Sequence, residues 1–306
     1  LHASYLLSRA GAAQSDGATA TSHAVADGIA GQPATSARVF PLDRIHILSL
    51  LISAICHDID HPGVSNQFLI NTSAPLAICY NDNSVLENHH AATTFTILSD
   101  PANNLLALLT LEQRREARQL ICKTILSTDM AHHSDMVKSL TALAADSKPI
   151  EPVEALQAYM HLADLSNAVL EPALARKWAL CVVAEFRQQA AREAELGMEV
   201  APHMRKLDTP YDIANLQVGF FDFVVLPLYK AASCIFPAVR ERLPQLIENR
   251  EAWFDERSRE GEKDGSRWQR SASSPTKAGR VRSPNTPRQS DGSSTGILER
   301  RLGRDT

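Results

Sequence analysis

Apolar residues recur at three- and four-residue spacing along most of the chain, which is the pattern of helices that bury one face. Segments in which apolar and polar residues alternate, as they do in strands, are few. Proline stands at or near several of the expected helix starts, where its missing N–H is tolerated. We therefore expect an all-α, compact multi-helix fold, with helices over residues 43–55, 84–98, 110–128, 152–164, 172–196, 213–232 and 237–257.

Length and composition are those of a globular protein. The chain has 306 residues, of which 44% are hydrophobic and 22% are charged, and no apolar run is long enough to span a bilayer. We expect a soluble protein of a reducing, cytoplasmic compartment, because the cysteines are widely spaced and form no Cys-x-x-Cys pair. These five are Cys56, Cys79, Cys122, Cys181 and Cys234.

The two ends of the chain differ in composition from its middle. Residues 1–9 have the pattern of the end of a truncated helix, and residues 10–38 that of a flexible low-complexity insertion rich in Ala, Gly, Ser and Thr. Residues 39–257 contain the helical patterns and form the one expected domain. Residues 258–306 are rich in Ser, Pro and Arg, so we expect a disordered basic tail there.

The tail contains candidate modification sites. Ser274, Ser283 and Thr286 each precede a proline and have basic neighbours, so kinases are possible partners of the tail. Arg-rich segments can also contact nucleic acid or anionic lipid. An inert extension is the simpler interpretation, and we expect no nucleic-acid partner.

The segment from His57 to His61 follows directly on the first apolar helix and is dense in groups that bind metal ions. We expect this segment to form the last turn of that helix, so that His57 and His61 lie on one face, with Asp58 beside the first of them. The alternative is a helix-end histidine next to a solvated carboxylate. For an isolated His-Asp pair that alternative is the more common one.

Three further clusters shift the balance towards a metal site. Glu87 stands beside two histidines, Asp164 ends an otherwise apolar helix, and Asp129 follows Thr128 at the end of another. A buried carboxylate without a partner is strongly unfavourable, so we expect a metal ion or a hydrogen-bond donor beside each of them. Together the four clusters indicate a metal-dependent hydrolase.

Long motifs occur in a fixed order within residues 40–257. They are HDIDHPGVSNQFLINT from His57, YNDNSVLENHH from Tyr80, STDM from Ser127, HLADLSN from His161, ELGMEVAP from Glu195 and LQVGFFDFVVLPL from Leu216. With these motifs the chain resembles the catalytic domain of the class I 3',5'-cyclic nucleotide phosphodiesterases, in particular their cAMP-specific type-four branch. The resemblance implies an all-α catalytic domain of the HD type. It would hydrolyse a cyclic nucleotide, with cAMP as the expected substrate, to the 5'-monophosphate in cyclic nucleotide signalling.

The resemblance also implies a centre of two divalent cations. His57, Asp58 and Asp164 match three of the four protein ligands of the tightly held cation, which in the family is usually zinc. Asp58 would also bridge to a second cation, usually magnesium or manganese. The residues that match those holding water around the second cation are His61, Glu87, Thr128 and Asp129.

A purine-binding site is implied as well. Gln217 matches a glutamine that binds the purine, while Phe220 and Val182 match the apolar residues on either side of the base. Asn167 lies where the family's pocket meets the purine. A planar ring gains apolar burial between such side chains, and an amide can orient it by hydrogen bonds. Without the resemblance, Gln217 and Phe220 would be read as one polar and one core residue of a helix.

The chain departs from the family in one important motif. The pattern His-Asn-x-x-His, which supplies the general acid and the fourth zinc ligand, is absent, and we expect it upstream of Leu1. His46 cannot replace the missing ligand, because a helix would place it about 16 Å from His57. The stretch from His203 to Arg205 also departs from the family's loop near the pocket.

Two alternatives to an active phosphodiesterase stay open. Because the general acid and one ligand are missing, the chain could be a catalytically silent module that binds cyclic nucleotides or regulates another protein. The other alternative is a different HD-type metal phosphohydrolase that acts on nucleotides or phosphate esters. The motif from Gln217 to Phe220 argues against this second alternative.

Overall fold

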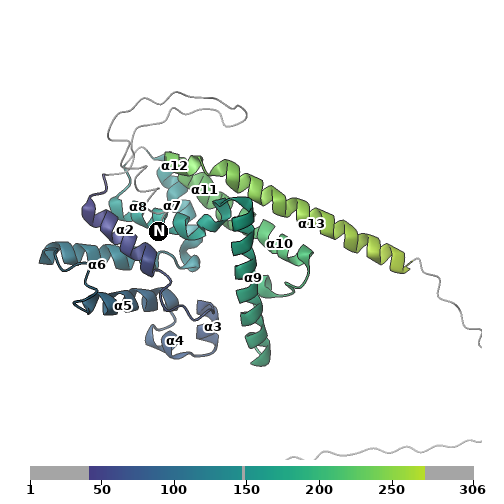
Figure 1. Ribbon diagram of the computed structural model, residues 1–306, viewed down its shortest axis with the longest axis horizontal. Coiled ribbons are helices and arrows are strands. Elements are labelled where there is room, and N and C mark those ends of the chain that lie inside the picture. The colour runs from purple at the N-terminus through teal and green to yellow at the C-terminus, as the bar shows by residue number, and fades with distance from the viewer. Residues whose placement is uncertain (1–40, 147–148, 273–306) are drawn as a thin grey trace, which may run out of the picture. The chain divides into compact units, whose positions relative to one another are not determined.

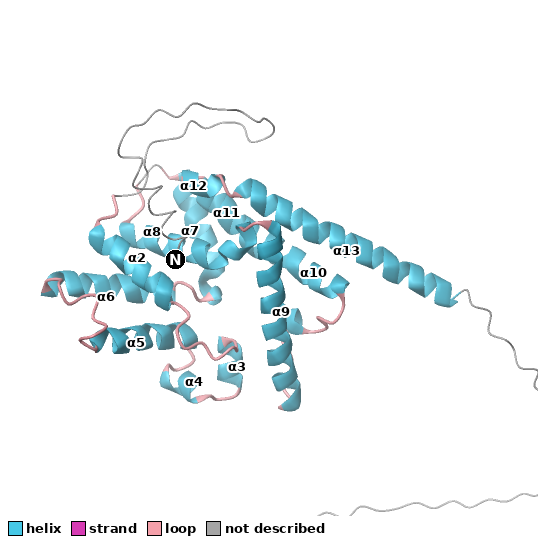
Figure 2. Cartoon of the chain, in the orientation of Figure 1, coloured by secondary structure: helices cyan, strands magenta, loops and turns pink. Residues whose placement is uncertain are grey.

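The computed structural model describes residues 41–146 and 149–272, with side chains as far as Lys263. Every regular element in that part of the chain is a helix, so the expected all-α class is confirmed (Figures 1 and 2). The expected insertion at 10–38, the expected helix end at 1–9 and the candidate kinase sites lie outside the described residues. The elements are α2 (Arg44–Cys56), α3 (Asn66–Asn71), α4 (Pro75–Cys79), α5 (Val85–Ser99), α6 (Leu111–Leu126), η2 (Met130–His132), α7 (His133–Ala145), α8 (Pro152–Asp164), η3 (Leu165–Val169), α9 (Pro172–Glu195), η4 (Pro202–Met204), α10 (Pro210–Phe220), η5 (Phe221–Val225), α11 (Leu226–Ser233), α12 (Pro237–Arg240) and α13 (Leu243–Ala272).

Helix α13 continues beyond the expected end at residue 257. It extends to Ala272, so the boundary predicted at residue 258 lies too early, and residues 258–272 are helical instead of disordered. This stretch lacks proline and is rich in Arg, Glu and Lys, which favour helix formation without any apolar face. An ion pair between Lys263 and Glu260 adds local support. By its contacts the chain divides into two units after Asp264.

The core of this unit forms where α2, α6 and α8 pack together. Leu50, Ile121 and Leu156, one from each helix, are fully buried in it. A second, smaller apolar cluster joins α3, α4 and the start of α5 around Phe68 and Leu86. The turn between α2 and α3, which contains the segment from His57 to His61, therefore connects the two clusters.

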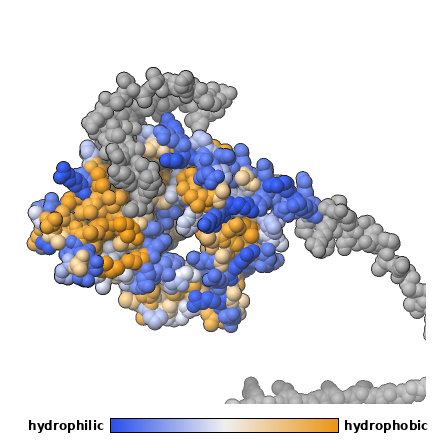
Figure 3. Space-filling model, in the orientation of Figure 1, coloured by the Kyte–Doolittle hydropathy of each residue, from blue (hydrophilic) through white to orange (hydrophobic). Residues whose placement is uncertain are grey.

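One face of the protein is unusually apolar. Figure 3 shows hydrophobic residues gathered over α2, α5 and α6. The connection between α5 and α6 contributes Leu105 and Leu108, and the first residue of α6 contributes Leu111, all of them exposed. Single exposed leucines are normal on a protein surface. No helix of the described part is both long and apolar enough to cross a membrane.

The helix expected over residues 213–232 begins earlier and is interrupted. It begins at Pro210, because the side chain of Thr209 caps it and accepts a hydrogen bond from the backbone N–H of Asp212. A π-helical turn, η5, then separates α10 from α11. Pro227 explains the wider turn, since proline has no N–H to donate and its ring excludes the carbonyl one turn earlier. Phe220 is the last residue before this turn.

Asn249 fixes α13 to the loop that follows α8. Its side chain is 3% exposed, and its Nδ2 donates to the backbone carbonyls of Ala168 and Leu170, both at 2.9 Å.

We expect Asn249→Ala to lower the free energy of unfolding by about 2–3 kcal/mol, because two carbonyls lose their donor at a buried site. Urea unfolding would measure it. The exposed Glu248→Ala is the control, expected within about 0.5 kcal/mol of the wild type, and equal losses in the two variants would contradict the prediction.

Candidate metal centre

The segment from His57 to His61 is a turn and not the last turn of a helix, which corrects the expectation from the sequence. Helix α2 ends at Cys56, and His57 is its C-cap. The backbone then turns, with the N–H of His61 donating to the carbonyl of Asp58 at 3.2 Å. Asp60 has a φ of 61°, in the left-handed region that ends helices. His57 and His61 therefore do not share a helix face, and each belongs to a different group of metal-binding atoms around Asp58.

His57 faces two carboxylates with one nitrogen. Its Nδ1 lies 3.2 Å from the carbonyl of Ala54, so this nitrogen is assigned the proton. Its Nε2 is 3.1 Å from Oδ1 of Asp164 and 3.3 Å from Oδ2 of Asp58. Asp164 comes from the end of α8, 107 residues away in the sequence. The fold thus brings the three residues expected as ligands of one cation within 4.8 Å of one another.

His90 occupies the other side of Asp58, and the sequence did not single it out as a ligand. Its Nδ1 lies 2.7 Å from the carbonyl of Ile59, and its Nε2 lies 3.9 Å from Oδ1 of Asp58. The two oxygens of Asp58 therefore face different imidazoles. The helical periodicity of α5 could have indicated this position, because the residues four before and four after His90, Leu86 and Thr94, are also buried.

His61 completes a second group of metal-binding atoms with Asp58 and His90. Its Nδ1 accepts a hydrogen bond from the backbone N–H of Gly63 at 3.0 Å. A neutral imidazole that accepts at Nδ1 carries its proton on Nε2, which makes Nε2 a donor. In this state His61 is better suited to hold a water molecule than to bind a cation directly.

Two further carboxylates are buried nearby. Glu87 is 9% exposed and Asp129 is 7% exposed, and in the described part of the chain neither has a cationic partner. Burial raises the pKa of Glu87, and the nearby carboxylates of Asp129 and Asp58 raise it further, against the effect of a hydrogen bond from Asn66. Buried carboxylates that repel one another fit a site for a divalent cation. The hydroxyl of Thr128 is also buried and donates to the carbonyl of Ile125 at 2.8 Å.

The surroundings of His57 favour positive charge. Burial alone would lower the pKa of His57, but hydrogen bonds to Asp164 and Asp58 raise it to about 10. The hydrogen bond with His57 correspondingly lowers the pKa of Asp58. Burial lowers the pKa of His90, against the effect of its hydrogen bond with the carbonyl of Ile59. A divalent cation at this position would take the place of the proton on Nε2 of His57.

The four residues expected to bind a purine lie on contacting elements. Val182 is an exposed residue of α9, Asn167 is half-buried in η3, and Gln217 is buried in α10, where Phe220 is half-buried. Helix α9 contacts η3, and η3 contacts η5, which follows Phe220 directly. The structure therefore brings the elements together, while the roles of the four side chains stay predictions.

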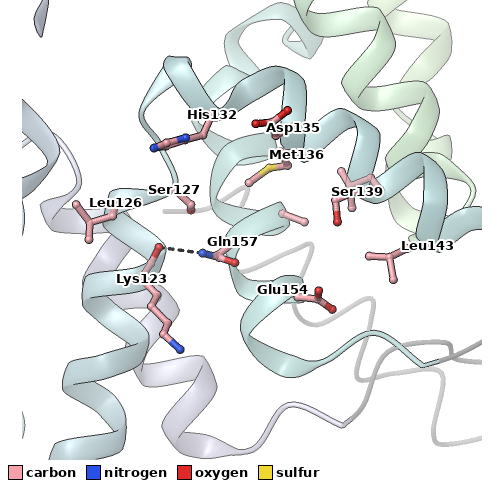
Figure 4. A pocket seen from close by; sticks show the side chains of 12 residues that line it. Lys123, Leu126, Ser127, His132, Asp135, Met136, Ser139, Leu143, Glu154 and Gln157 are labelled. Carbon is pink, nitrogen blue, oxygen red and sulfur yellow. Dashed lines mark hydrogen bonds between the residues drawn. The ribbon is translucent and has the colours of Figure 1, made fainter. Parts of the chain in front are cut away.

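A cavity of about 420 Å³ lies elsewhere, among α6, α7 and α8 (Figure 4). Met136 and Leu140 contribute to its apolar lining, and Gln157 at its edge donates to the backbone carbonyl of Lys123 at 3.2 Å. None of the residues assigned to the cations or to the purine lines this cavity. One lining residue, Ser127, directly precedes Thr128 in the sequence.

An all-α domain with paired groups of metal-binding side chains around one aspartate defines a class of metal-dependent phosphohydrolases. The family model described as 3'5'-cyclic nucleotide phosphodiesterase matches residues 32–246. The chain therefore belongs to the 3'5'-cyclic nucleotide phosphodiesterase family, as its motifs indicated.

Individual relatives and a solved structure agree with this family. The chain is 36% identical over 225 residues to the "Probable 3',5'-cyclic-AMP phosphodiesterase pde-4" of Caenorhabditis elegans, covering 70% of this chain and 33% of the relative. It is 36% identical over 239 residues to the "3',5'-cyclic-AMP phosphodiesterase 4C" of Mus musculus, covering 74% and 34%. The chain thus spans about a third of the length of these relatives. The phosphodiesterase domain of the RhoPDE fusion protein from the choanoflagellate Salpingoeca rosetta is 30% identical, with a TM-score of 0.70 over 72% of each chain.

Proposed function

We propose that this chain supplies most of the catalytic site of a metal-dependent phosphodiesterase that hydrolyses a 3',5'-cyclic nucleotide to the 5'-monophosphate. The observation that carries the proposal is the placement of Asp58. One of its oxygens faces His57, which also contacts Asp164, and the other oxygen faces His90. A carboxylate with a separate group of ligands on each side is suited to bridge two cations.

The chemistry of each group of ligands favours a different cation. His57 and Asp164 offer one nitrogen and one carboxylate in addition to Asp58, which suits zinc. Near the other oxygen of Asp58, the carboxylates of Glu87 and Asp129 favour a harder ion such as magnesium or manganese, held largely through water. Two divalent cations would lower the pKa of an attacking water and neutralise charge on the phosphate.

The residues of the chain itself would orient the reactants. Hydrolysis joins the oxygen of water to phosphorus and breaks the bond between phosphorus and the 3' oxygen, which leaves with a proton. We propose that the Nε2–H of His61 and the carboxylates of Glu87 and Asp129 hold water in place, together with the hydroxyl of Thr128. The general acid is assigned to none of the described residues.

We propose cAMP as the substrate, because the relatives from mouse and C. elegans are named for cAMP. In this proposal Gln217 orients the purine by hydrogen bonds, Phe220 and Val182 cover its two faces, and Asn167 contacts its edge. We also propose that the reaction takes place in the cytoplasm. The five cysteines are all free, which fits a reducing compartment.

The proposal is tested by Asp164→Ala. We expect this variant to lose the tightly held cation and at least about 1000-fold of the hydrolysis rate, since one ligand and the partner of His57 are removed together. Hydrolysis of cAMP and bound zinc would be measured on residues 1–306 and, in parallel, with any coding sequence upstream of Leu1 included.

Asp208→Ala is the matched control. Asp208 is an exposed carboxylate outside both groups of metal-binding residues, so this variant should keep its zinc and its activity. An Asp164→Ala variant that hydrolyses cAMP at the wild-type rate would refute the proposed function. Preference for a linear nucleotide over cAMP would favour another HD-type phosphohydrolase, and cAMP binding without turnover would favour a silent module.

A further inference from the structure

Ser84 has an unusual position beside the proposed centre. It is the N-cap residue of α5, where a serine side chain normally accepts a hydrogen bond from the first turn of the helix, but it makes no such bond. Instead its hydroxyl donates to Oδ2 of Asp129 at 2.7 Å. Its backbone is left-handed, with a φ of 38°, which is unfavourable for a residue other than glycine. The serine thus gives up its capping bond and adopts a strained backbone while it binds a buried carboxylate.

Asn66 makes a similar contact from the start of α3. Its Nδ2 donates to Oε2 of Glu87 at 2.9 Å, and its Oδ1 accepts from the backbone N–H of Leu86 at 2.8 Å. The amide therefore holds both the side chain of Glu87 and the backbone immediately before it. Leu86 and Glu87 lie in the first turn of α5, where backbone N–H groups need acceptors from outside the helix.

The two contacts have the same chemical character. Each buried carboxylate, Glu87 or Asp129, is held by a neutral side chain and not by a lysine or arginine. A neutral donor fixes the direction of a carboxylate but leaves its charge uncompensated, so the charge stays available to a cation. An arginine at either position would orient the carboxylate equally well and would also neutralise it.

We propose that Asn66 and Ser84 are positioning residues, which hold the carboxylates of Glu87 and Asp129 ready for the water-bound cation beside Asp58. This inference rests on the proposed function, because it assumes that a cation binds there. It adds two residues from outside the ligand set, and it explains why Ser84 keeps a strained backbone where glycine would be relaxed.

The test uses Mn²⁺ as the probe and the zinc-loaded chain of residues 1–306. The dissociation constant of Mn²⁺ would be measured by electron paramagnetic resonance of the free ion. We expect Ser84→Gly and Asn66→Ala each to weaken Mn²⁺ binding by about three- to tenfold. Ser84→Gly is chosen because glycine accepts the positive φ, so the variant should keep or raise the melting temperature while it loses affinity.

Two matched controls separate positioning from general damage. Gln67→Ala and Asn83→Ala remove exposed amides directly next to Asn66 and Ser84, and both should bind Mn²⁺ as the wild type does. Double variants test directly whether each positioning residue acts through its carboxylate. If Ser84 acts through Asp129, Ser84→Gly should have no further effect on Mn²⁺ binding in a chain that already carries Asp129→Asn. The same should hold for Asn66→Ala in a chain that carries Glu87→Gln.

Three results would contradict the positioning role of Asn66 and Ser84. Wild-type affinity in both single variants would overturn it, and so would an undiminished effect in the Asp129→Asn and Glu87→Gln backgrounds. A loss of affinity that is matched by Gln67→Ala or Asn83→Ala would also overturn it. If the wild-type chain binds no Mn²⁺ at all, the proposed function fails together with the inference, whereas failure of the inference alone leaves wild-type binding intact.

Discussion

Asp58→Asn is expected to weaken the binding of both cations at once. Its two oxygens face separate groups of metal-binding atoms, so the loss of its charge affects each group. We expect the affinities for Zn²⁺ and for Mn²⁺ each to fall by about 100-fold or more, and hydrolysis to fall by at least about 1000-fold. Metal content by mass spectrometry and Mn²⁺ titration would measure the two sites separately. Asp164→Ala, in contrast, should affect Zn²⁺ far more than Mn²⁺.

Asp60→Asn is the natural control for this prediction. Asp60 lies in the same turn, and its Oδ2 is 2.8 Å from Nε2 of His89, but it belongs to neither group of metal-binding residues. Asparagine tolerates the left-handed backbone at this position, so the substitution removes charge without adding strain. Both cations should bind normally to this variant. If Asp58→Asn lowered the affinity for only one cation, Asp58 would not be a bridging residue.

Helical periodicity predicted most of the long helices, because each buries one face along its whole length. Helix α8 begins at Pro152 and ends at Asp164, as the pattern indicated, and α9 begins at Pro172. Short helices such as α3 and α4 contain too few turns to show a period, so the sequence did not reveal them. Residues 258–272 contain few apolar residues, so no periodic pattern could indicate the helix there.

The candidate site was predictable from its motifs only in part. The residues His57, Asp58 and Asp164 could be named from their sequence context, and the fold brings them together. Asn66 and Ser84 could not, because their contacts join segments that are distant in the chain. Asn66 meets Glu87 across 21 residues, and Ser84 meets Asp129 across 45. The contact of Asn66 depends on how the turn after α2 leads into α3, and that turn was itself expected to be helical.

A buried pair of histidines, one of which interacts with Asp164, should lower the free energy of unfolding at acid pH. Nδ1 of His133 in α7 lies 2.9 Å from Nε2 of His161 in α8, and His161 is fully buried. Burial and, to a smaller extent, the neighbouring His133 lower the pKa of His161 from its ordinary value near 6.5 to about 4, and only Asp164 opposes this. As the pH falls from about 6.5 to about 4, the unfolded chain therefore takes up a proton that the folded chain does not. The folded state should lose up to about 3 kcal/mol of stability over this range, and all of it should be present above pH 6.5.

Urea unfolding between pH 7 and pH 4.5 would measure this dependence. In His161→Gln the amide can still meet His133, but the proton-binding group is gone, so the slope of stability against pH should fall by about 1.4 kcal/mol per pH unit. His132→Gln is the control, because His132 is exposed at the rim of the cavity in Figure 4 and should leave the slope unchanged. Burial also lowers the pKa of His133, which adds to the slope with the same sign and persists in the His161 variant. Equal slopes in the wild type and in His161→Gln would show that His161 takes up its proton in the folded protein as readily as in the unfolded chain.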